Sequence, residues 1–374
     1  MKPFTLDELH HWVQQVASEN VDWAIFRPPH SPDIWLYAGQ ADRFDSDDQG
    51  FVVQPWDRHA PPMRIPYREC RRYASGLEMP AQGKRGPDRT FPAGDSKDKT
   101  YQQLVLRSLQ AIEEGQFQKV VPARAYNRLV KDSCHPASVF SKLLVHYPAA
   151  AVHWLHLSNH GTWMGASPEI LIRYHAGQAQ TMALAGTIAS DDPSAGFSKK
   201  EREEQRQVAT LIRSVLSAHK VDWEESATQR VTYGPVSHLQ SMFEIRGREG
   251  RSLQRAEVLR MARDLHPTPA VCGWPRDAAW HFLERAEPMR RALYAGYLGP
   301  VHENDLALYV NLRCMQWHGD RATFYAGAGV VPGSDPDAEW AETERKMQTL
   351  LRFIPIAEDD VHRQNANAGS GASK

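Results

Sequence analysis

The feature that most constrains this chain is a helix near its C-terminus that places carboxylates on an apolar stripe. Glu339, Glu342 and Lys346 recur at the spacing of one helical face, and the same stripe continues to Leu350 and Phe353. Acidic side chains that share a stripe with apolar ones are costly to bury unless a cation or a ligand meets them. The pattern therefore predicts either a buried acidic site or a charged helix face that stays in water.

The start of this helix is clearly marked in the sequence. Ser334 or Asp335 can cap its N-terminus, and Pro336 suits the first helical turn. A helix of this kind needs a core to pack against. The 374 residues are 41% hydrophobic, which is enough for a large core, and 25 prolines with 24 glycines indicate many turns.

Composition excludes several classes of function. The net charge of −1 provides no general basic field for nucleic acid or an anionic membrane, although basic residues that converge locally can still bind an anionic substrate. Cys70, Cys134, Cys272 and Cys314 are far apart and form no CxxC pair, which argues against a disulfide framework or a zinc site and fits the cytoplasm. No apolar run approaches the roughly 18 residues of a membrane span, and residues 1–6 lack the apolar core of a signal peptide.

The order of the predicted elements favours an α+β fold. Residues 1–98 predict a short first helix followed by strands and loops, belong to the same globule as the rest, and end in a flexible Gly/Pro-rich segment at 76–98. A catalytic domain is expected at 99–356 and a disordered tail at 357–374. Within that domain we predict helices at 99–114, 198–219, 254–265 and 276–287, strands at 119–126, 149–155, 162–165, 170–174 and 180–184, and a closing strand pair at 306–313 and 322–326. Strands and helices mix without a regular βαβ repeat.

A second helix offers another buried acid. Ser198 and Glu201 form a capping box, and Glu204 lies four residues before Val208 on the apolar stripe. Glu204 and Glu342 could therefore share one hard cation, and Mg²⁺ suits this number of carboxylates because it keeps several waters. The alternative for Glu204 is an ordinary acid near a helix start, where the helix dipole favours it.

Two strand residues are candidates for proton transfer. Lys119 lies within an apolar strand, where it is either an edge charge that reaches out to water or a buried amine that can act as a base. Glu169 lies between a Gly/Pro turn and an apolar strand, where it is either a solvated turn acid or a buried acid that can donate a proton. The sequence pattern leaves both alternatives open.

Taken together, these motifs resemble those of the chorismate-using enzymes, a family that includes isochorismate, salicylate, anthranilate and aminodeoxychorismate synthases. The resemblance covers residues 100–355. It is carried, in order, by Lys119-Val-Val121, Gly165-Ala-Ser-Pro-Glu169, Leu184-Ala-Gly-Thr187, Lys200-Glu-Arg-Glu-Glu204, Ser237-His-Leu239, Leu265-His-Pro-Thr-Pro-Ala-Val-Cys-Gly273, Tyr294-Ala-Gly296, Arg313, Ala326-Gly-Ala-Gly329 and residues 334–346. The family fold would be two packed, mainly antiparallel sheets flanked by helices, with the active site between them.

The resemblance implies a role for each candidate residue. Chorismate would bind Mg²⁺ held by Glu204 and Glu342, with Glu339 close by. The motif register and the apolar stripe both favour Glu204 over Glu203 as the ligand. Lys119 would act as the base and Glu169 as the acid. Substrate contacts are expected from His238, Arg313, Lys346, Gly186, Thr187, Gly327, Ala270 and Tyr294. A packed structural histidine is the alternative for His238.

Two positions sort the reactions of the family. Aminodeoxychorismate synthases carry a nucleophilic lysine where this chain has Ala185, and an alanine leaves room for a small nucleophile instead. The segment Pro267–Gly273, which includes Ala270, resembles isochorismate synthases more than the ammonia-using members. Water is therefore the expected nucleophile and isochorismate the expected product. The alternatives are a salicylate synthase, which also eliminates pyruvate, and a catalytically inactive homologue. We expect a monomer without a glutaminase subunit.

Overall fold

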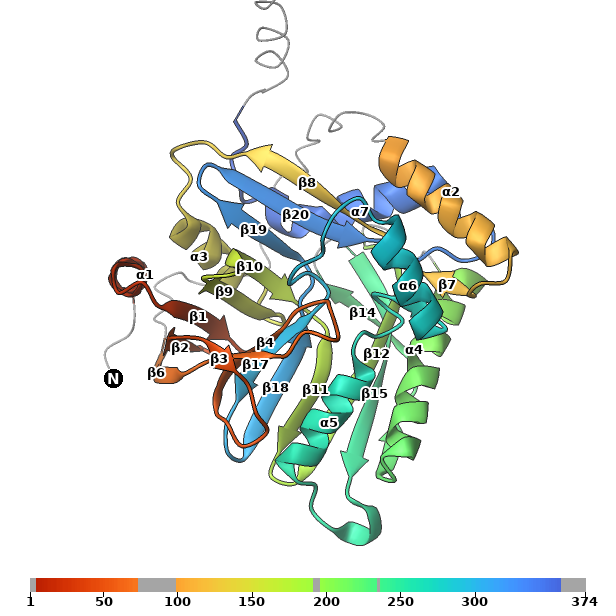
Figure 1. Ribbon diagram of the computed structural model, residues 1–374, viewed down its shortest axis with the longest axis horizontal. Coiled ribbons are helices and arrows are strands. Elements are labelled where there is room, and N and C mark those ends of the chain that lie inside the picture. The colour runs from red at the N-terminus through yellow and green to blue at the C-terminus, as the bar shows by residue number, and fades with distance from the viewer. Residues whose placement is uncertain (1–4, 73–98, 191–195, 234–235, 358–374) are drawn as a thin grey trace, which may run out of the picture.

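The fold is described from a computed structural model that places residues 5–72, 99–190, 196–233 and 236–357. Two large antiparallel sheets dominate it (Figure 1). In the described part the first sheet has eight strands, in the order β6 (Tyr67–Arg72), β2 (Asp33–Gly39), β1 (Asp22–Arg27), β9 (Ala151–Leu157), β10 (Gly161–Ser167), β19 (Cys314–His318), β20 (Arg321–Gly327) and β8 (Ala123–Leu129).

The second sheet is built in the same antiparallel way. Its described strands run in the order β13 (Asp222–Glu225), β15 (Val236–Arg246), β12 (Gln178–Ala189), β11 (Ile170–His175), β18 (Asp305–Val310), β17 (Tyr297–Val301), β4 (Gly50–Gln54), β5 (Met63–Ile65) and β3 (Asp42–Arg43), and β14 (Gln229–Tyr233) also pairs with β15. A short third ladder joins β7 (Lys119–Val120) to β16 (Gly273–Trp274). The expected α+β class with two antiparallel sheets is confirmed.

Helices cover the sheets on both sides. They are α1 (Leu6–Ser18), α2 (Lys99–Glu113), α3 (Pro136–His146), α4 (Lys199–Ala218), α5 (Arg255–Leu265), α6 (Arg276–Ala286), α7 (Pro336–Leu351) and a 3₁₀ turn at Arg248–Gly250. Residues of α1, α3 and α7 share one apolar cluster with the first sheet, while α4 and α5 pack on the second sheet (Figure 1). The predicted helices at 99–114, 198–219, 254–265 and 276–287 are therefore confirmed within one or two residues at each end.

Aromatic side chains fill the space between the sheets. The ring of Phe26 on β1 lies 5.6 Å from that of Phe51 on β4 and 5.8 Å from that of Tyr309 on β18. Residues 5–72 thus contribute strands to both sheets and to the core between them. The Gly/Pro-rich segment at 76–98 and, apart from Ala357, the tail at 357–374 lie outside the described residues.

The structure corrects one strand prediction and refines another. The strands predicted at 306–313 and 322–326 do not pair, because β18 belongs to the second sheet and β20 to the first, where β20 pairs with β19 and β8. Arg313, with a φ of 48°, lies between the two sheets at the turn into β19. The single strand predicted at 119–126 is two strands, β7 and β8, interrupted at Pro122, which has no N–H for a ladder.

Candidate active site

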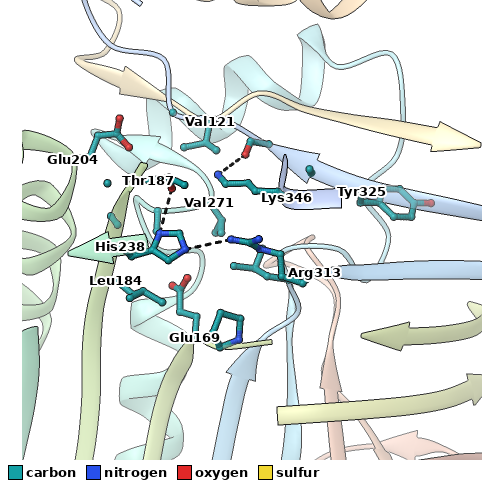
Figure 2. A pocket seen from close by; sticks show the side chains of 18 of the residues that line it. Val121, Glu169, Leu184, Thr187, Glu204, His238, Val271, Arg313, Tyr325 and Lys346 are labelled. Atoms are coloured by element: carbon teal, nitrogen blue, oxygen red, sulfur yellow. Dashed lines mark hydrogen bonds between the residues drawn. The ribbon is translucent and has the colours of Figure 1, made fainter. Parts of the chain in front are cut away.

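A cavity opens where the two sheets meet the N-terminal part of α4 and the C-terminal helix α7. Most of the residues predicted from the sequence line it. They are Glu169, Ala185, Gly186, Thr187, Glu204, His238, Ala270, Tyr294, Arg313, Gly327 and Lys346. Figure 2 shows the side chains of Glu169, Thr187, Glu204, His238, Arg313 and Lys346 around one space, to which several elements contribute.

Three predicted residues do not line the cavity and lie behind its wall. The Nζ atom of Lys119 lies 3.3 Å from the Oε2 atom of Glu204, and Lys119 is only 1% exposed. Glu339 is likewise 1% exposed, and Glu342 contacts Lys346 at 2.7 Å. Burial rules out the solvated-face alternative for Glu339 and the edge-charge alternative for Lys119.

Local sequence explains how α7 presents its acids. The Asp335 side chain accepts a hydrogen bond from the Ala338 N–H at 2.8 Å, which caps the helix as predicted. The stripe of Glu339 and Glu342 then faces inward. On α4 the capping box of Ser198 and Glu201 is present, and it fixes the turn that aims Glu204 inward.

Three acids and three lysines form what we call the lysine–carboxylate cluster, made of Lys119, Lys200, Lys346, Glu204, Glu339 and Glu342. The Lys200 Nζ atom lies 2.5 Å from the Glu339 Oε1 atom and 3.9 Å from the Glu204 Oε1 atom. The Lys346 Nζ atom lies 2.7 Å from the Glu342 Oε1 atom and donates to the Gly327 carbonyl at 2.8 Å. Each of the three acids thus lies beside a lysine nitrogen.

The pKa values in the cluster follow burial and these partners. Burial raises the pKa of Glu204 and Glu339, although the neighbouring lysines oppose this. Burial also disfavours the ionised form of Glu342, but Lys346 and Lys200 hold the pKa of that carboxyl below its ordinary value. The Glu203 side chain instead pairs with Arg206 at 2.5 Å on the surface of α4.

Glycine makes room for the cluster. A Cβ atom at Gly329 would lie 2.7 Å from the Glu204 Oε2 atom and 3.1 Å from the Lys119 Cε atom. Gly186, with a φ of 71°, forms a bulge in β12, and a Cβ atom there would lie 2.5 Å from the Glu201 carbonyl oxygen. These two positions let β12 and the 326–329 segment approach α4.

The opposite end of the cavity carries an acid without an ion-pair partner. Glu169 follows β10 and Pro168, is 3% exposed, and among the described residues has no Lys or Arg nitrogen within 4 Å of its carboxyl. Burial raises the pKa of Glu169 to about 8, against the pull of Lys346, Arg313 and Lys119. The solvated-turn alternative for Glu169 is therefore wrong, and the side chain is protonated at neutral pH.

His238 joins Thr187 to Arg313 in a hydrogen-bonded chain (Figure 2). Burial and the neighbouring cations lower the pKa of His238 well below its ordinary value, so the ring is neutral. Because a guanidinium only donates, the Nε2 atom of His238 accepts from Arg313 at 3.3 Å. The Nδ1 atom then carries the proton and donates to the Thr187 hydroxyl oxygen at 3.2 Å.

Sequence reasoning missed three residues of this region. Lys200 lies four residues before Glu204 on α4, which is the spacing of a helical ion pair and is a signal visible in the sequence. Tyr325 lines the cavity and stacks on Tyr294 with ring centroids 5.6 Å apart. Gly329 belongs to the Ala-Gly-Ala-Gly motif. A residue without a Cβ atom is needed there because of Glu204 and Lys119, which are far away in the chain.

The donor set of the cluster fits a hard cation. Carboxylate oxygens are the ligands that Mg²⁺ takes from proteins. The Oε2 atom of Glu339 is buried without a hydrogen-bond partner, so one carboxylate oxygen is available for a ligand. Within the described ranges no group of three acidic, histidine or cysteine side chains is placed to hold a metal, and the Lys200 ammonium contacts both Glu204 and Glu339.

Fold and cavity together define an α+β protein with a buried acid at one end of a cleft and a lysine–carboxylate cluster at the other. The chain belongs to the chorismate binding enzyme family, whose family model matches residues 72–355. None of the described helices combines the length and apolar character needed to cross a bilayer.

Curated relatives share the same stretch. The chain is 30% identical over 268 residues to isochorismate synthase EntC of Escherichia coli (strain K12), covering 69% of this chain and 67% of that one. It is 31% identical over 266 residues to isochorismate synthase MenF of the same organism, covering 68% and 61%. The solved structure of that menaquinone-specific isochorismate synthase superposes with a TM-score of 0.71 at 23% identity, over 88% of both chains.

Proposed function

We propose that this protein is an isochorismate synthase that adds water to C2 of chorismate and removes the C4 hydroxyl, with Mg²⁺ as its cofactor. The observation that carries the proposal is the placement of Glu169, whose pKa burial raises to about 8, at one end of the cavity, and of Glu204, with Lys119 buried behind it, at the other. The reaction needs a proton donor on one side of the ring and a base on the other. The isochorismate synthases among its relatives support it.

Substrate binding falls to the cations and backbone of the cavity. Chorismate carries two carboxylates, and Arg313 and Lys346 both line the cavity. A planar guanidinium suits a bidentate grip on a carboxylate. Backbone groups near Gly186 and Gly327 would complete the contacts, and Tyr294 would pack beside the ring. The Thr187 hydroxyl already accepts from His238, so its own proton is free to point into the cavity.

Glu204 and Glu342 would hold the Mg²⁺ ion, with Glu339 close by through its unpartnered oxygen. When bound, Mg²⁺ supplies positive charge that fixes and polarises a substrate carboxylate. Because Lys200 occupies the space between Glu204 and Glu339, its ammonium would have to move aside. The isomerisation then depends on the residues of the protein for its proton transfers.

Two different residues would carry out the two proton transfers. Lys119 would take a proton from water as the oxygen attacks C2, and Glu169 would give its proton to the C4 hydroxyl, which leaves as water. The ring double bonds shift between these events, so one water is added and one is lost. The protonated state of Glu169 at neutral pH supports its role as the donor.

The cavity wall leaves room for a small nucleophile, and the resemblance of residues 267–273 to isochorismate synthases favours water over ammonia. Ala185 lines the cavity with a methyl group, which leaves space for a small molecule and supplies no nucleophile. Ala270 places a second methyl group on the same wall. Since no ammonia donor is needed, we expect the protein to act as a cytoplasmic monomer without a glutaminase subunit.

Product analysis tests the proposal. The purified protein is incubated with chorismate and MgCl₂, with and without EDTA, and the products are separated by chromatography while pyruvate is measured with lactate dehydrogenase. We expect isochorismate, no pyruvate, and no turnover in EDTA until Mg²⁺ is restored. Salicylate with free pyruvate would identify a salicylate synthase. No turnover under any condition would identify an inactive homologue, and an aminated product with ammonia would exclude water addition.

A further inference from the structure

A buried ion pair lies directly behind the cavity wall, outside the residues considered so far. Glu287 and Arg291 follow α6, and their side chains are 4% and 1% exposed. The Arg291 Nε atom donates to the Glu287 Oε2 atom at 2.8 Å, and one terminal nitrogen donates to Oε1 at 2.5 Å. This is the parallel two-bond geometry that a guanidinium and a carboxylate prefer.

The pair also holds backbone from two separate segments. Arg291 donates to the carbonyl of Val121 at 2.7 Å and to the carbonyl of Val271 at 2.8 Å. The Glu287 carboxylate accepts from the Ala123 N–H at 2.8 Å. Both valines line the cavity, so this network fixes the backbone of its wall.

The two carbonyl groups that Arg291 binds lie close in sequence to residues with proposed roles in the reaction. Val121 lies two positions after Lys119, in the interruption between β7 and β8. Val271 follows Ala270 directly. The two segments also meet through a hydrogen bond from the Val121 N–H to the Cys272 carbonyl at 2.9 Å. A shift of Arg291 would therefore move both segments.

Trp56, from the N-terminal region, also contacts Arg291. The Trp56 ring lies over the Arg291 guanidinium, with its centroid 4.1 Å from the guanidinium carbon. The backbone N–H of Trp56 donates to the Ala292 carbonyl at 2.9 Å, and Trp56 is largely buried. This contact gives residues 5–72 a direct link to the cavity wall.

Stability alone does not explain such an arrangement. Removing two charges from water costs about as much as their attraction returns, so well-packed apolar side chains often serve stability equally well. What an apolar pair cannot do is donate to two carbonyls, which are costly to bury without a donor. We propose that Glu287 and Arg291, covered by Trp56, are positioning residues that fix Lys119 and Ala270 around the cavity. The kinetic part of this inference rests on the proposed function.

Arg291→Lys tests the geometry while it keeps the charge. A lysine ammonium lacks the planar fork and cannot serve Glu287 and both carbonyls together. We expect kcat for chorismate to fall by roughly 10- to 100-fold, since displacements near 1 Å can cost that much, with a smaller change in KM. Arg251→Lys is the matched control. It alters an exposed two-bond pair with Glu257 at 2.7 Å, and we expect wild-type kinetics.

A second measurement needs no substrate. Amide hydrogen exchange should become faster in residues 118–123 and 268–273 of Arg291→Lys, and remain at wild-type rates in β9 and β10 of the first sheet and in the Arg251→Lys control. If wild-type protein does not convert chorismate, the proposed function fails, but this exchange result still tests the positioning. Wild-type exchange and wild-type kcat in Arg291→Lys would overturn the inference.

A double variant covers the case in which Arg291→Lys does not fold. Glu287→Met with Arg291→Met leaves no unpaired buried charge, and we expect a cooperatively folded protein by circular dichroism. It should show the same fast exchange in the two segments and the same fall in kcat. A double variant with normal exchange and normal turnover would show that the pair only fills space.

Discussion

The two ends of the cavity differ in whether their buried ionisable side chains have ion-pair partners. In the lysine–carboxylate cluster, Glu204, Glu339 and Glu342 each have a lysine nitrogen within 3.3 Å. At the other end, Glu169 and His238 are just as buried, yet among the described residues neither pairs with an opposite charge. Here burial raises the pKa of Glu169 and lowers that of His238.

This difference in ion pairing suits the two ends of the cavity to different chemical roles. In the cluster each acid lies beside a lysine nitrogen, and this mixture of carboxylates and amines suits the binding of a cation and a carboxylate. Unpaired groups take the neutral form, which leaves Glu169 with a proton to give.

Removing the proton at the unpaired end should have the largest effect. Glu169→Gln keeps the size and hydrogen bonding of the side chain but cannot give up a proton. We expect isochorismate formation to fall by about 10²–10⁴-fold, the usual cost of losing a positioned acid. Turnover and chorismate binding are measured with Glu303→Gln as the control. Near-normal turnover would show that Glu169 is not the proton donor. The proposed difference in function between the two ends of the cavity would then be wrong.

Lys119→Ala tests the base within the paired end. We expect a loss of about 10²–10⁴-fold in isochorismate formation, with the protein folded and still able to bind chorismate. Thermal melts and chorismate titration by calorimetry provide the checks on folding and binding. If turnover persists, Lys119 only neutralises Glu204.

The acids of the cluster should control the metal requirement. Glu204→Ala or Glu342→Ala should raise the Mg²⁺ concentration needed for half-maximal activity greatly, or abolish activity. Glu203→Ala should do much less, because the Glu203 side chain pairs with Arg206 on the surface. Equal damage from Glu203→Ala and Glu204→Ala in Mg²⁺ titrations would contradict the inward assignment of Glu204.

Ala185 lies between the two ends, and Ala185→Lys should block the space for the attacking water. We expect most isochorismate formation to be lost, with a covalent adduct visible by intact-protein mass spectrometry if the buried amine attacks the ring. Ala185→Gly is the size control and should retain activity. Unimpaired water addition by Ala185→Lys would show that this position does not border the nucleophile site.

The smallest effect concerns pH. Since the acid must be protonated and burial raises the pKa of Glu169 to about 8, kcat should decline as pH rises through about 8. An acid with an ordinary pKa would already be ionised at pH 6. A pH profile of kcat between about 4 and 9 decides the matter, and a decline that begins near pH 5 would mean that Glu169 is not the donor.

Much of the site was visible in local patterns. The stripe on α7, the capping box of α4 and the acid after Pro168 all depend on neighbouring residues, so periodicity and capping rules predict them. The same rules could not predict that β18 and β20 enter different sheets, because strand pairing depends on the whole chain. They also left open whether Lys119 and Glu169 are buried.

By itself the sequence determined the α+β class, the helices and the resemblance to chorismate-using enzymes, because these follow from local spacing and motif order. Only the tertiary structure decided which acids meet which lysines, for Lys119 and Glu204 lie 85 residues apart and Lys200 and Glu339 lie 139 apart. It also decided that Glu287 and Arg291 hydrogen-bond to two segments of the cavity wall that are far apart in the chain. These contacts depend on the packing of segments that are distant in the chain, and packing is a property of the whole folded molecule.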